Sequence, residues 1–172
     1  INAMANRGTP FIGLLYAGLA LTSKGIRVIE FNARFGDPET EVLLPRLETP
    51  LAQLLYAAAT KSLDKFKELK WSNKSAVTVV LASEGYPSEP KVDLPVTGIK
   101  ENENTFVYHA GTKLKDGVIH SAGGRVLTVT GIGENLSAAR NNAYQVISGI
   151  TLAGSHFRSD IALTASQLGS DK

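Results

Sequence analysis

The stretch VIEFNARFGDPETE, residues 28–41, joins a short apolar run to a dense group of polar side chains. The run from Ile26 to Phe31 has the β-branched composition of a strand. Side chains alternate between the two faces of a strand, so Glu30 and Asn32 share one face. The sequence therefore predicts a strand that presents a carboxylate and an amide oxygen together at its end.

These oxygens suit a magnesium ion, which takes one or two protein ligands together with phosphate oxygens and water. Arg34 shares their side if the strand continues, and its guanidinium can bind a phosphate through two hydrogen bonds. Metal ligands and an arginine are parts of a phosphoryl-transfer site. The alternative is an edge strand with a solvated polar end, and the Glu-x-Asn spacing alone does not separate the two.

The loop after the strand predicts the start of a helix. Pro38 is expected as its first residue, with Asp37 as the N-cap. Glu39 and Glu41 then lie in the first turn, where acidic side chains interact favourably with the helix dipole. These acids are therefore expected to be mainly structural.

The composition is that of ordinary globular protein. The sequence has 172 residues, 43% hydrophobic and 20% charged, which suits one medium domain or two small ones. The 18 basic and 16 acidic residues are not segregated, so we expect neither a nucleic-acid partner nor a membrane partner. The sequence has no cysteine, which rules out disulfides and thiolate metal sites and is compatible with the cytoplasmic location that we expect.

The rest of the first half is predicted to be helical. The dense apolar residues at 11–23 predict a buried helix that ends at Lys24 and Gly25. Pro50 predicts the start of another helix over residues 51–63. Because a lone strand cannot bury itself, the run from Ile26 to Phe31 must pair with the second half or with segments outside this sequence.

The second half, from the boundary near Trp71, is predicted to be mostly strands. Four strand-like runs cover residues 76–83, 105–114, 117–123 and 125–133, and the KDG and GG links suggest hairpins. Residues 134–150 form an amphipathic helix pattern, and residues 156–172 suggest a short helix with a disordered tail. The predicted fold class is α+β, with helices and one strand in domain 1–72 and a small antiparallel β-rich domain with a packed helix at 73–172.

A longer string carries a family resemblance. EFNARFGDPETEVLLPRL, residues 30–47, resembles the phosphoribosylamine–glycine ligases, whose signature is present here as RFGDPE. Five further strings resemble the same family in the same order: GTPFIGLLYAGL, TVVLASEGYP, HAGTKL, SAGGRVLTVTG and SHFRSDI. The resemblance runs from about Gly8 to Ile161. It implies the end of an ATP-grasp domain followed by the C-terminal domain of such a ligase.

The resemblance also implies a reaction and roles for residues. These ligases join glycine to 5-phosphoribosylamine in purine biosynthesis, cleaving ATP to ADP and phosphate through a glycyl phosphate. By this resemblance Glu30 and Asn32 bind Mg²⁺ or Mn²⁺ that bridges the ATP phosphates, and Arg34 contacts the γ-phosphate or the acyl phosphate. Asp37 is the second catalytic candidate and holds an amino group or supports the loop, with plain helix capping as the alternative.

The second half supplies candidates for substrate binding. Related purine ligases place basic residues near the position of Arg125 to hold a ribose 5-phosphate. We therefore expect Arg125, and after it Lys113, to bind the phosphate of phosphoribosylamine. The alternative is that Arg125 is a hairpin residue with a surface ion pair.

The family's chain is much longer than this sequence. Its N-terminal portion carries the lysines, the phosphate loop and the adenine pocket that hold ATP, so we expect that portion of the same polypeptide as a partner and expect this chain alone to be inactive. One alternative is another ATP-grasp ligase, against which the RFGDPE string argues. The other is a non-catalytic binding module, against which the retained Glu30, Asn32 and Arg34 argue.

Overall fold

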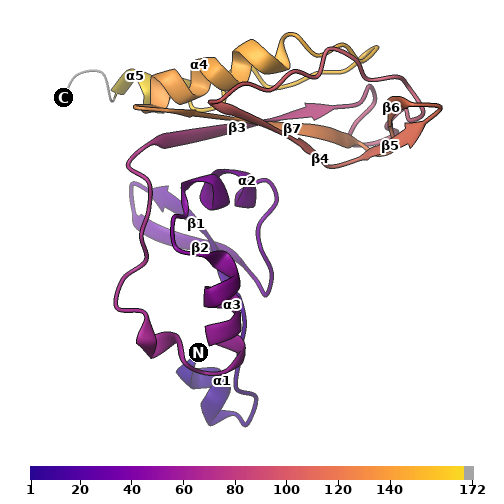
Figure 1. Ribbon diagram of the computed structural model, residues 1–172. Helices are drawn as coiled ribbons and strands as arrows, with labels where there is room; N and C mark the ends of the chain where they lie inside the picture. The colour runs from indigo at the N-terminus through magenta and orange to yellow at the C-terminus, as the bar shows by residue number, and fades with distance from the viewer. Residues whose placement is uncertain (169–172) are drawn as a thin grey trace. The chain divides into compact units, whose positions relative to one another are not determined.

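The computed structural model describes residues 1–168, which form two compact units (Figure 1). Unit 1 consists of residues 1–40 and 47–72, and unit 2 consists of residues 41–46 and the chain from residue 73 onward. Helices and small antiparallel sheets are mixed along the chain, which confirms the predicted α+β class.

Unit 1 is built around a β-hairpin. Strands β1 (Tyr16–Thr22) and β2 (Gly25–Asn32) pair in antiparallel fashion and are joined by a two-residue turn. The predicted strand is confirmed, but the helix predicted over residues 11–23 is wrong. An apolar run of this length is compatible with either a buried helix or a strand, and pairing with β2 decides for the strand. β1 is also the partner that the predicted lone strand lacked.

The other elements among residues 1–72 are short helices. They are α1 (Asn2–Asn6), α2 (Thr40–Leu43), the 3-10 helix η1 (Leu44–Arg46), α3 (Leu51–Ala59) and the 3-10 helix η2 (Leu63–Lys65). Helix α3 begins directly after Pro50, as predicted, and ends four residues earlier than expected. The Thr60 hydroxyl, just past its end, donates to the Tyr56 carbonyl oxygen at 2.8 Å.

Unit 2 contains a three-stranded antiparallel sheet. Its strand order is β3 (Ser75–Ala82), β7 (Arg125–Gly133) and β4 (Thr105–His109). Every residue of β7 is buried or half-buried, as expected for a central strand covered on both faces. This strand therefore organises the core of the unit.

A separate hairpin is formed by β5 (Thr112–Lys115) and β6 (Val118–Ser121). The predicted KDG connection between these strands is confirmed. The predicted GG hairpin between β6 and β7 is wrong, because β7 pairs with β3 and β4 and not with β6. Two adjacent glycines allow a turn, but they do not determine which strands pair across it.

Helix α4 (Leu136–Ile147) runs along this sheet (Figure 1). Ala139, Ala143, Val146 and Ile147 are its buried residues, which confirms the predicted amphipathic helix. They join the sheet in one hydrophobic core.

The chain ends, as far as it is described, in the short helix α5 (Leu163–Leu168), which confirms the predicted C-terminal helix. The predicted disordered tail falls on residues 169–172, outside the described residues. No helix in the described part of the chain combines the length and the apolar character that crossing a membrane requires.

Candidate functional site

The predicted pair of metal ligands lies at the end of β2. The side-chain amide of Asn32 donates a hydrogen bond to Oε1 of Glu30 at 2.8 Å, so the two side chains lie on the same face, as their spacing predicts. The Oδ1 atom of Asn32 and the two carboxylate oxygens of Glu30 are hard oxygen donors. This donor set fits a magnesium or manganese ion that takes its remaining ligands from phosphate and water.

Strand β1 shapes this end of the hairpin. Gly18 faces Glu30 in the register, and a Cβ atom at position 18 would lie 3.1 Å from Cγ of Glu30. Tyr16 faces Asn32. The sequence reasoning missed both residues because a helix over 11–23 gives them no relation to β2. The signal that could have revealed them is the pairing requirement of β2 itself.

Tyr16 connects β1 to the loop after β2. Its hydroxyl donates to Oε1 of Glu39 at 3.0 Å. This hydrogen bond raises the pKa of Tyr16, with smaller contributions from burial and from the negative charges of Glu39 and Glu30. Glu39 therefore turns back toward β1, and its expected place in the first turn of a helix is wrong.

The helix after the loop begins later than predicted. Helix α2 begins at Thr40, whose N–H donates to the Gly36 carbonyl oxygen at 3.2 Å. Asp37 and Pro38 lie in the preceding turn, so Asp37 as the N-cap and Pro38 as the first helical residue are wrong. Glu41 does lie in the first turn of α2, as expected. Asp37 is exposed and lies close in the sequence to the candidate metal ligands.

Arg34 is exposed in a bend just after β2. Because β2 ends at Asn32, the strand does not continue in the way that would place Arg34 on the same face. One of its terminal nitrogens donates to the Phe35 carbonyl oxygen at 2.8 Å. A guanidinium has five N–H donors, so this bond leaves others for an anion.

Arg125 is the first residue of the central strand β7 and is half-buried. The alternative for Arg125 was a hairpin residue with a surface ion pair. β7 does not pair with β6, so Arg125 does not belong to a β6–β7 hairpin. The two glycines before it are held by Ser83. The Ser83 N–H donates to the Gly124 carbonyl oxygen at 2.8 Å, and the Ser83 hydroxyl donates to the Gly123 carbonyl oxygen at 3.0 Å.

Lys113 lies on β5 and has a carboxylate partner. Its Nζ atom is 2.8 Å from Oδ1 of Asp93, and Nζ of Lys115 is 3.9 Å from the same oxygen. The hydrogen bond from Lys113 lowers the pKa of Asp93 below its usual value, and the charges of Lys113, Lys115 and His120 act in the same direction. Lys113 must therefore leave or share Asp93 to bind a phosphate.

The predicted site residues fall into two groups. Glu30, Asn32, Arg34 and Asp37 belong to unit 1, whereas Lys113 and Arg125 belong to unit 2. Among residues 1–168 no group of three or more histidine, aspartate or glutamate side chains is placed to hold a metal ion.

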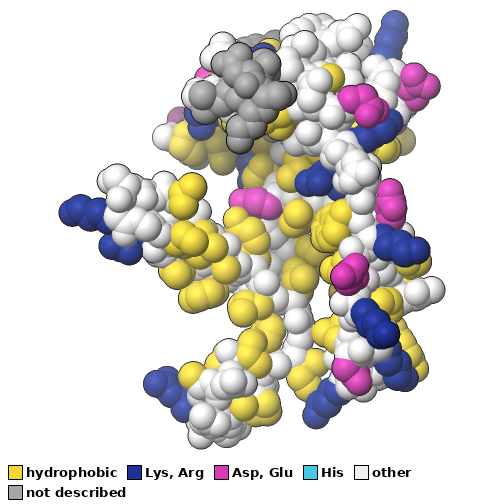
Figure 2. Space-filling view, turned by 90° about the vertical axis from the view of Figure 1, so that its left-hand side faces the viewer, with side chains coloured by type: hydrophobic (Ala, Val, Ile, Leu, Met, Phe, Trp, Pro, Cys, Tyr) yellow, Lys and Arg dark blue, Asp and Glu magenta, His cyan; other side chains and the backbone are white. Residues whose placement is uncertain are grey.

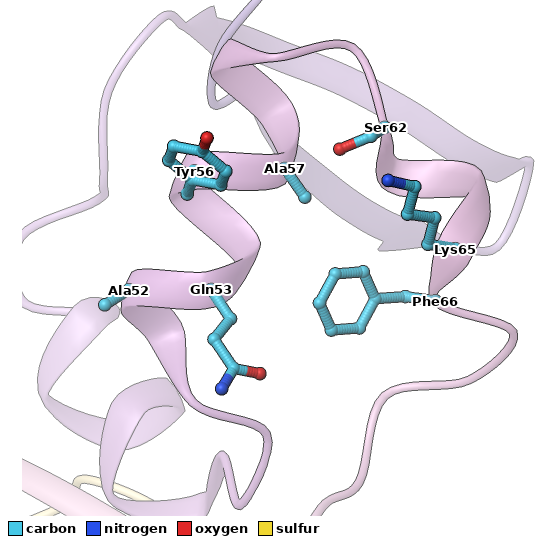
Figure 3. Close-up of a pocket in the computed structure, with 7 residues that line it drawn as sticks. All are labelled: Ala52, Gln53, Tyr56, Ala57, Ser62, Lys65 and Phe66. Atoms are coloured by element: carbon cyan, nitrogen blue, oxygen red, sulfur yellow. The ribbon is translucent and has the colours of Figure 1, made fainter.

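A pocket of about 410 Å³ in unit 1 is separate from these groups (Figure 3). It lies between α3 and the segment around η2, and the ring of Phe66 points toward α3. The residues lining it are Ala52, Gln53, Tyr56, Ala57, Ser62, Lys65 and Phe66. Its mostly apolar lining includes none of the predicted site residues and offers no carboxylate for a metal or an amino group.

Two family descriptions match the chain. "Phosphoribosylglycinamide synthetase, C domain" matches residues 76–164, and "Phosphoribosylglycinamide synthetase, ATP-grasp (A) domain" matches residues 1–40. The first match lies within unit 2, and the second covers the hairpin of unit 1 and the loop that follows it.

Named relatives agree with these matches. The chain is 54% identical over 170 residues to a phosphoribosylamine–glycine ligase of Streptomyces coelicolor, an alignment that covers 96% of this chain and 41% of that protein. It is 55% identical over 165 residues to the ligase of Mycobacterium tuberculosis, with 95% of this chain and 38% of that protein covered. The chain thus spans about 40% of the length of these relatives.

A solved structure shows the same fold. The crystal structure of phosphoribosylamine–glycine ligase from Thermotoga maritima matches with a TM-score of 0.78 and 33% sequence identity, and the match covers 92% of this chain and 39% of that chain. Because sequence and fold agree along both units, the chain belongs to the phosphoribosylglycinamide synthetase family, also called the phosphoribosylamine–glycine ligases.

Proposed function

We propose that this chain is part of an ATP-dependent ligase that joins glycine to 5-phosphoribosylamine, giving glycinamide ribonucleotide, ADP and phosphate in purine biosynthesis. The observation that carries the proposal is the paired Glu30 and Asn32 at the end of β2, followed by the RFGDPE loop, in a member of this family. Unit 1 is the end of the ATP-grasp domain, and unit 2 is the C-terminal domain of the ligase.

The candidate residues of unit 1 have different roles in the proposed phosphoryl transfer. Glu30 and Asn32 would hold a magnesium or manganese ion, which when bound offsets the negative charge of the ATP phosphates. Arg34 contacts the transferred phosphoryl group, because its planar guanidinium matches the geometry of phosphate oxygens. Asp37 accepts a hydrogen bond from a substrate amino group.

The proposed chemistry proceeds in two transfers. The glycine carboxylate attacks the γ-phosphorus of ATP and displaces ADP, which gives glycyl phosphate. The amine of phosphoribosylamine then attacks the glycyl carbonyl carbon, phosphate leaves, and the nitrogen loses a proton as the amide forms. Arg34 stabilises the charge on the phosphoryl oxygens in both steps.

Unit 2 holds the ribose phosphate in this proposal. Arg125 is the principal ligand of the 5-phosphate, since it is half-buried on the central strand and its guanidinium can form two parallel hydrogen bonds. Lys113 is a secondary ligand that exchanges Asp93 for the phosphate. Both contribute to the affinity for phosphoribosylamine and not to that for ATP.

The proposed partner is the N-terminal portion of the same polypeptide. The hairpin of unit 1 leaves large apolar side chains exposed on both strands, and Figure 2 shows hydrophobic side chains gathered on the molecular surface. The exposed large apolar side chains of the two strands are those of Leu19, Leu21, Ile26, Val28, Ile29 and Phe31. A two-stranded sheet is marginal by itself, and extended apolar surface marks a contact region. The N-terminal portion would cover this surface, hold ATP and complete a cytoplasmic enzyme.

The metal role is tested in the full-length ligase that contains this chain. Glu30→Gln keeps the shape of the side chain and removes its charge. We expect it to lower metal affinity by at least the roughly 10- to 100-fold that is typical for loss of an outer-shell partner, because Glu30 is a proposed direct ligand. Ligase activity is measured as a function of magnesium concentration. Glu68→Gln, at an exposed acid in the same unit, is the matched control and should behave as the wild type. An unchanged magnesium dependence in Glu30→Gln would refute the metal-ligand role.

The need for the N-terminal portion is tested with residues 1–172 alone. We expect no ATP hydrolysis dependent on glycine and phosphoribosylamine, because the proposed ATP-holding apparatus lies in the remaining part of the ligase. Turnover by the isolated chain would contradict the proposed partner.

A further inference from the structure

The turn before Arg125 is fastened to the loop that follows β3. Ser83 is fully buried, and it binds the carbonyl oxygens of both Gly123 and Gly124 through its hydroxyl and its N–H. The carbonyl oxygen of Ser83 in turn accepts the N–H of Tyr86 at 3.2 Å. One buried serine therefore connects the glycine turn to the loop that carries Tyr86.

The Tyr86 ring packs directly on Gly124. A Cβ atom at position 124 would overlap Cδ2 of Tyr86 and would lie 3.0 Å from Cε2. The ring therefore occupies the space that a side chain at this position would need. Tyr86 is 38% exposed, so it also contributes to the protein surface beside Gly124, the residue that precedes Arg125.

The loop that carries the ring is closed by its own contacts. The Glu89 N–H donates to the Gly85 carbonyl oxygen at 2.9 Å, and the Lys91 N–H donates to the Glu84 carbonyl oxygen at 2.8 Å. The Lys91 ammonium also lies 2.7 Å from Oε1 of Glu84. These bonds restrict the main chain on both sides of Tyr86, so an ordered loop holds the ring against Gly124.

We propose that Tyr86 is a positioning residue for Arg125 and, through it, for the 5-phosphate of phosphoribosylamine. The ring and Ser83 fix the main chain at Gly124 from two sides. This main chain sets the direction in which the next side chain, Arg125, leaves β7. The inference rests on the proposed function of Arg125 as the phosphate ligand.

The experiment measures steady-state kinetics of the full-length ligase with Tyr86→Ala and Tyr86→Phe. We expect Tyr86→Ala to raise the KM for phosphoribosylamine about tenfold, because a misplaced guanidinium loses a charged hydrogen bond to phosphate. The KM values for ATP and glycine should stay unchanged. Tyr86→Phe keeps the ring and should retain the wild-type KM. Phe106→Ala, a 38% exposed aromatic of the same unit, is the matched control and should leave all three KM values unchanged.

Two further variants distinguish positioning from general structural damage. Arg125→Ala should raise the same KM, and adding Tyr86→Ala to it should have no further effect, because both changes act through one guanidinium. Gly124→Ala displaces the ring and should raise the KM for phosphoribosylamine as Tyr86→Ala does. Combining Gly124→Ala with Tyr86→Ala removes the overlap and should be no worse than Gly124→Ala alone, which tests the contact itself.

The possible negative results refute different proposals. If Arg125→Ala leaves the KM for phosphoribosylamine unchanged, both the proposed role of Arg125 and this inference are overturned. If Arg125→Ala raises it and Tyr86→Ala does not, only this inference is overturned. It is also overturned if Tyr86→Ala raises all three KM values equally, or if its full effect persists in the Arg125→Ala background.

Discussion

Replacing Gly131 by alanine would test the closest approach between β7 and α4. Gly131 lies within the central strand, and a Cβ atom there would overlap the carbonyl oxygen of Ala139 and the amide nitrogen of Ala143. It would also lie 3.1 Å from Cα of Ala143. These are main-chain atoms of a helix, so no rotation of a side chain can relieve the overlap. Either α4 moves away from the sheet or β7 bends.

The expected cost follows from this rigidity. Adding a methyl group to a well-packed core typically costs about 1–3 kcal/mol, and a group opposed by main chain on a buried face belongs at the upper end. A helix displaced by a fraction of an ångström to about 1 Å also loses part of its dispersion contacts along the whole interface. We therefore expect Gly131→Ala to destabilise unit 2 by about 3 kcal/mol, or about 150-fold in the equilibrium for opening.

Amide hydrogen exchange measures this loss locally. Peptides from β7 and α4 should exchange faster in Gly131→Ala, whereas peptides from β1 and β2 in unit 1 should not change. Gly149→Ala is the matched control just past the end of the same helix, where the nearest atom to an added Cβ is the Val146 carbonyl oxygen at 3.4 Å. Equal exchange in the two variants would refute the argument that β7 and α4 leave no room for a methyl group.

Three further predictions concern single contacts. Asn135→Ala removes the side-chain acceptor at the N-terminus of α4 and should lower the free energy of unfolding, measured by thermal denaturation, by about 1 kcal/mol. Asn135→Ser should retain most of the wild-type stability. Equal midpoints for wild type and Asn135→Ala would contradict this. Lys113 lowers the pKa of Asp93 below 3.8. The Lys113–Asp93 pair therefore stabilises the fold above that pH, and this stabilisation is lost as the pH falls through the lowered pKa. Asp93→Asn should remove this acid-side decrease in melting temperature, and an unchanged decrease would show that the pair contributes nothing. The hydrogen bond to Glu39 raises the pKa of Tyr16 above 10.0, so the contribution of this bond to folding stability is complete below that pH and is lost as the pH rises through the raised pKa. Glu39→Gln should move the titration midpoint of labelled Tyr16, followed by NMR, back toward 10.0. An unmoved midpoint would mean that the bond does not form.

Most elements of unit 2 were predictable from their patterns, but the single strand predicted over residues 105–114 is wrong, because β4 and β5 divide this run between two sheets. The alternation and length of the apolar runs identified β3, β7 and α4, and a short polar link identified the β5–β6 hairpin. The pairing of β7 was not predictable from a neighbouring turn. It depends on which strands can hydrogen-bond to the two edges of this buried strand, and this is decided by the packing of the whole unit.

The main wrong prediction, the helix over residues 11–23 in unit 1, has a related cause. The residues of β1 are apolar at spacings that a helix could also bury, so local pattern did not choose between helix and strand. The choice came from β2, whose unpaired backbone groups require a neighbour. The same error hid Tyr16 and Gly18, which are related to the candidate metal ligands only through the strand register.

The sequence alone determined the chemistry of the candidate site, since Glu30 and Asn32 share a face through the two-residue period of a strand and the RFGDPE loop follows without interruption. The family could also be inferred from the sequence, because its characteristic strings are local and follow one another in a fixed order. Only the tertiary structure decided what supports these residues: Tyr16 against Glu39, and Ser83 and Tyr86 around the turn before Arg125. These contacts join segments far apart in the chain, and their formation depends on packing and pairing that no local pattern encodes.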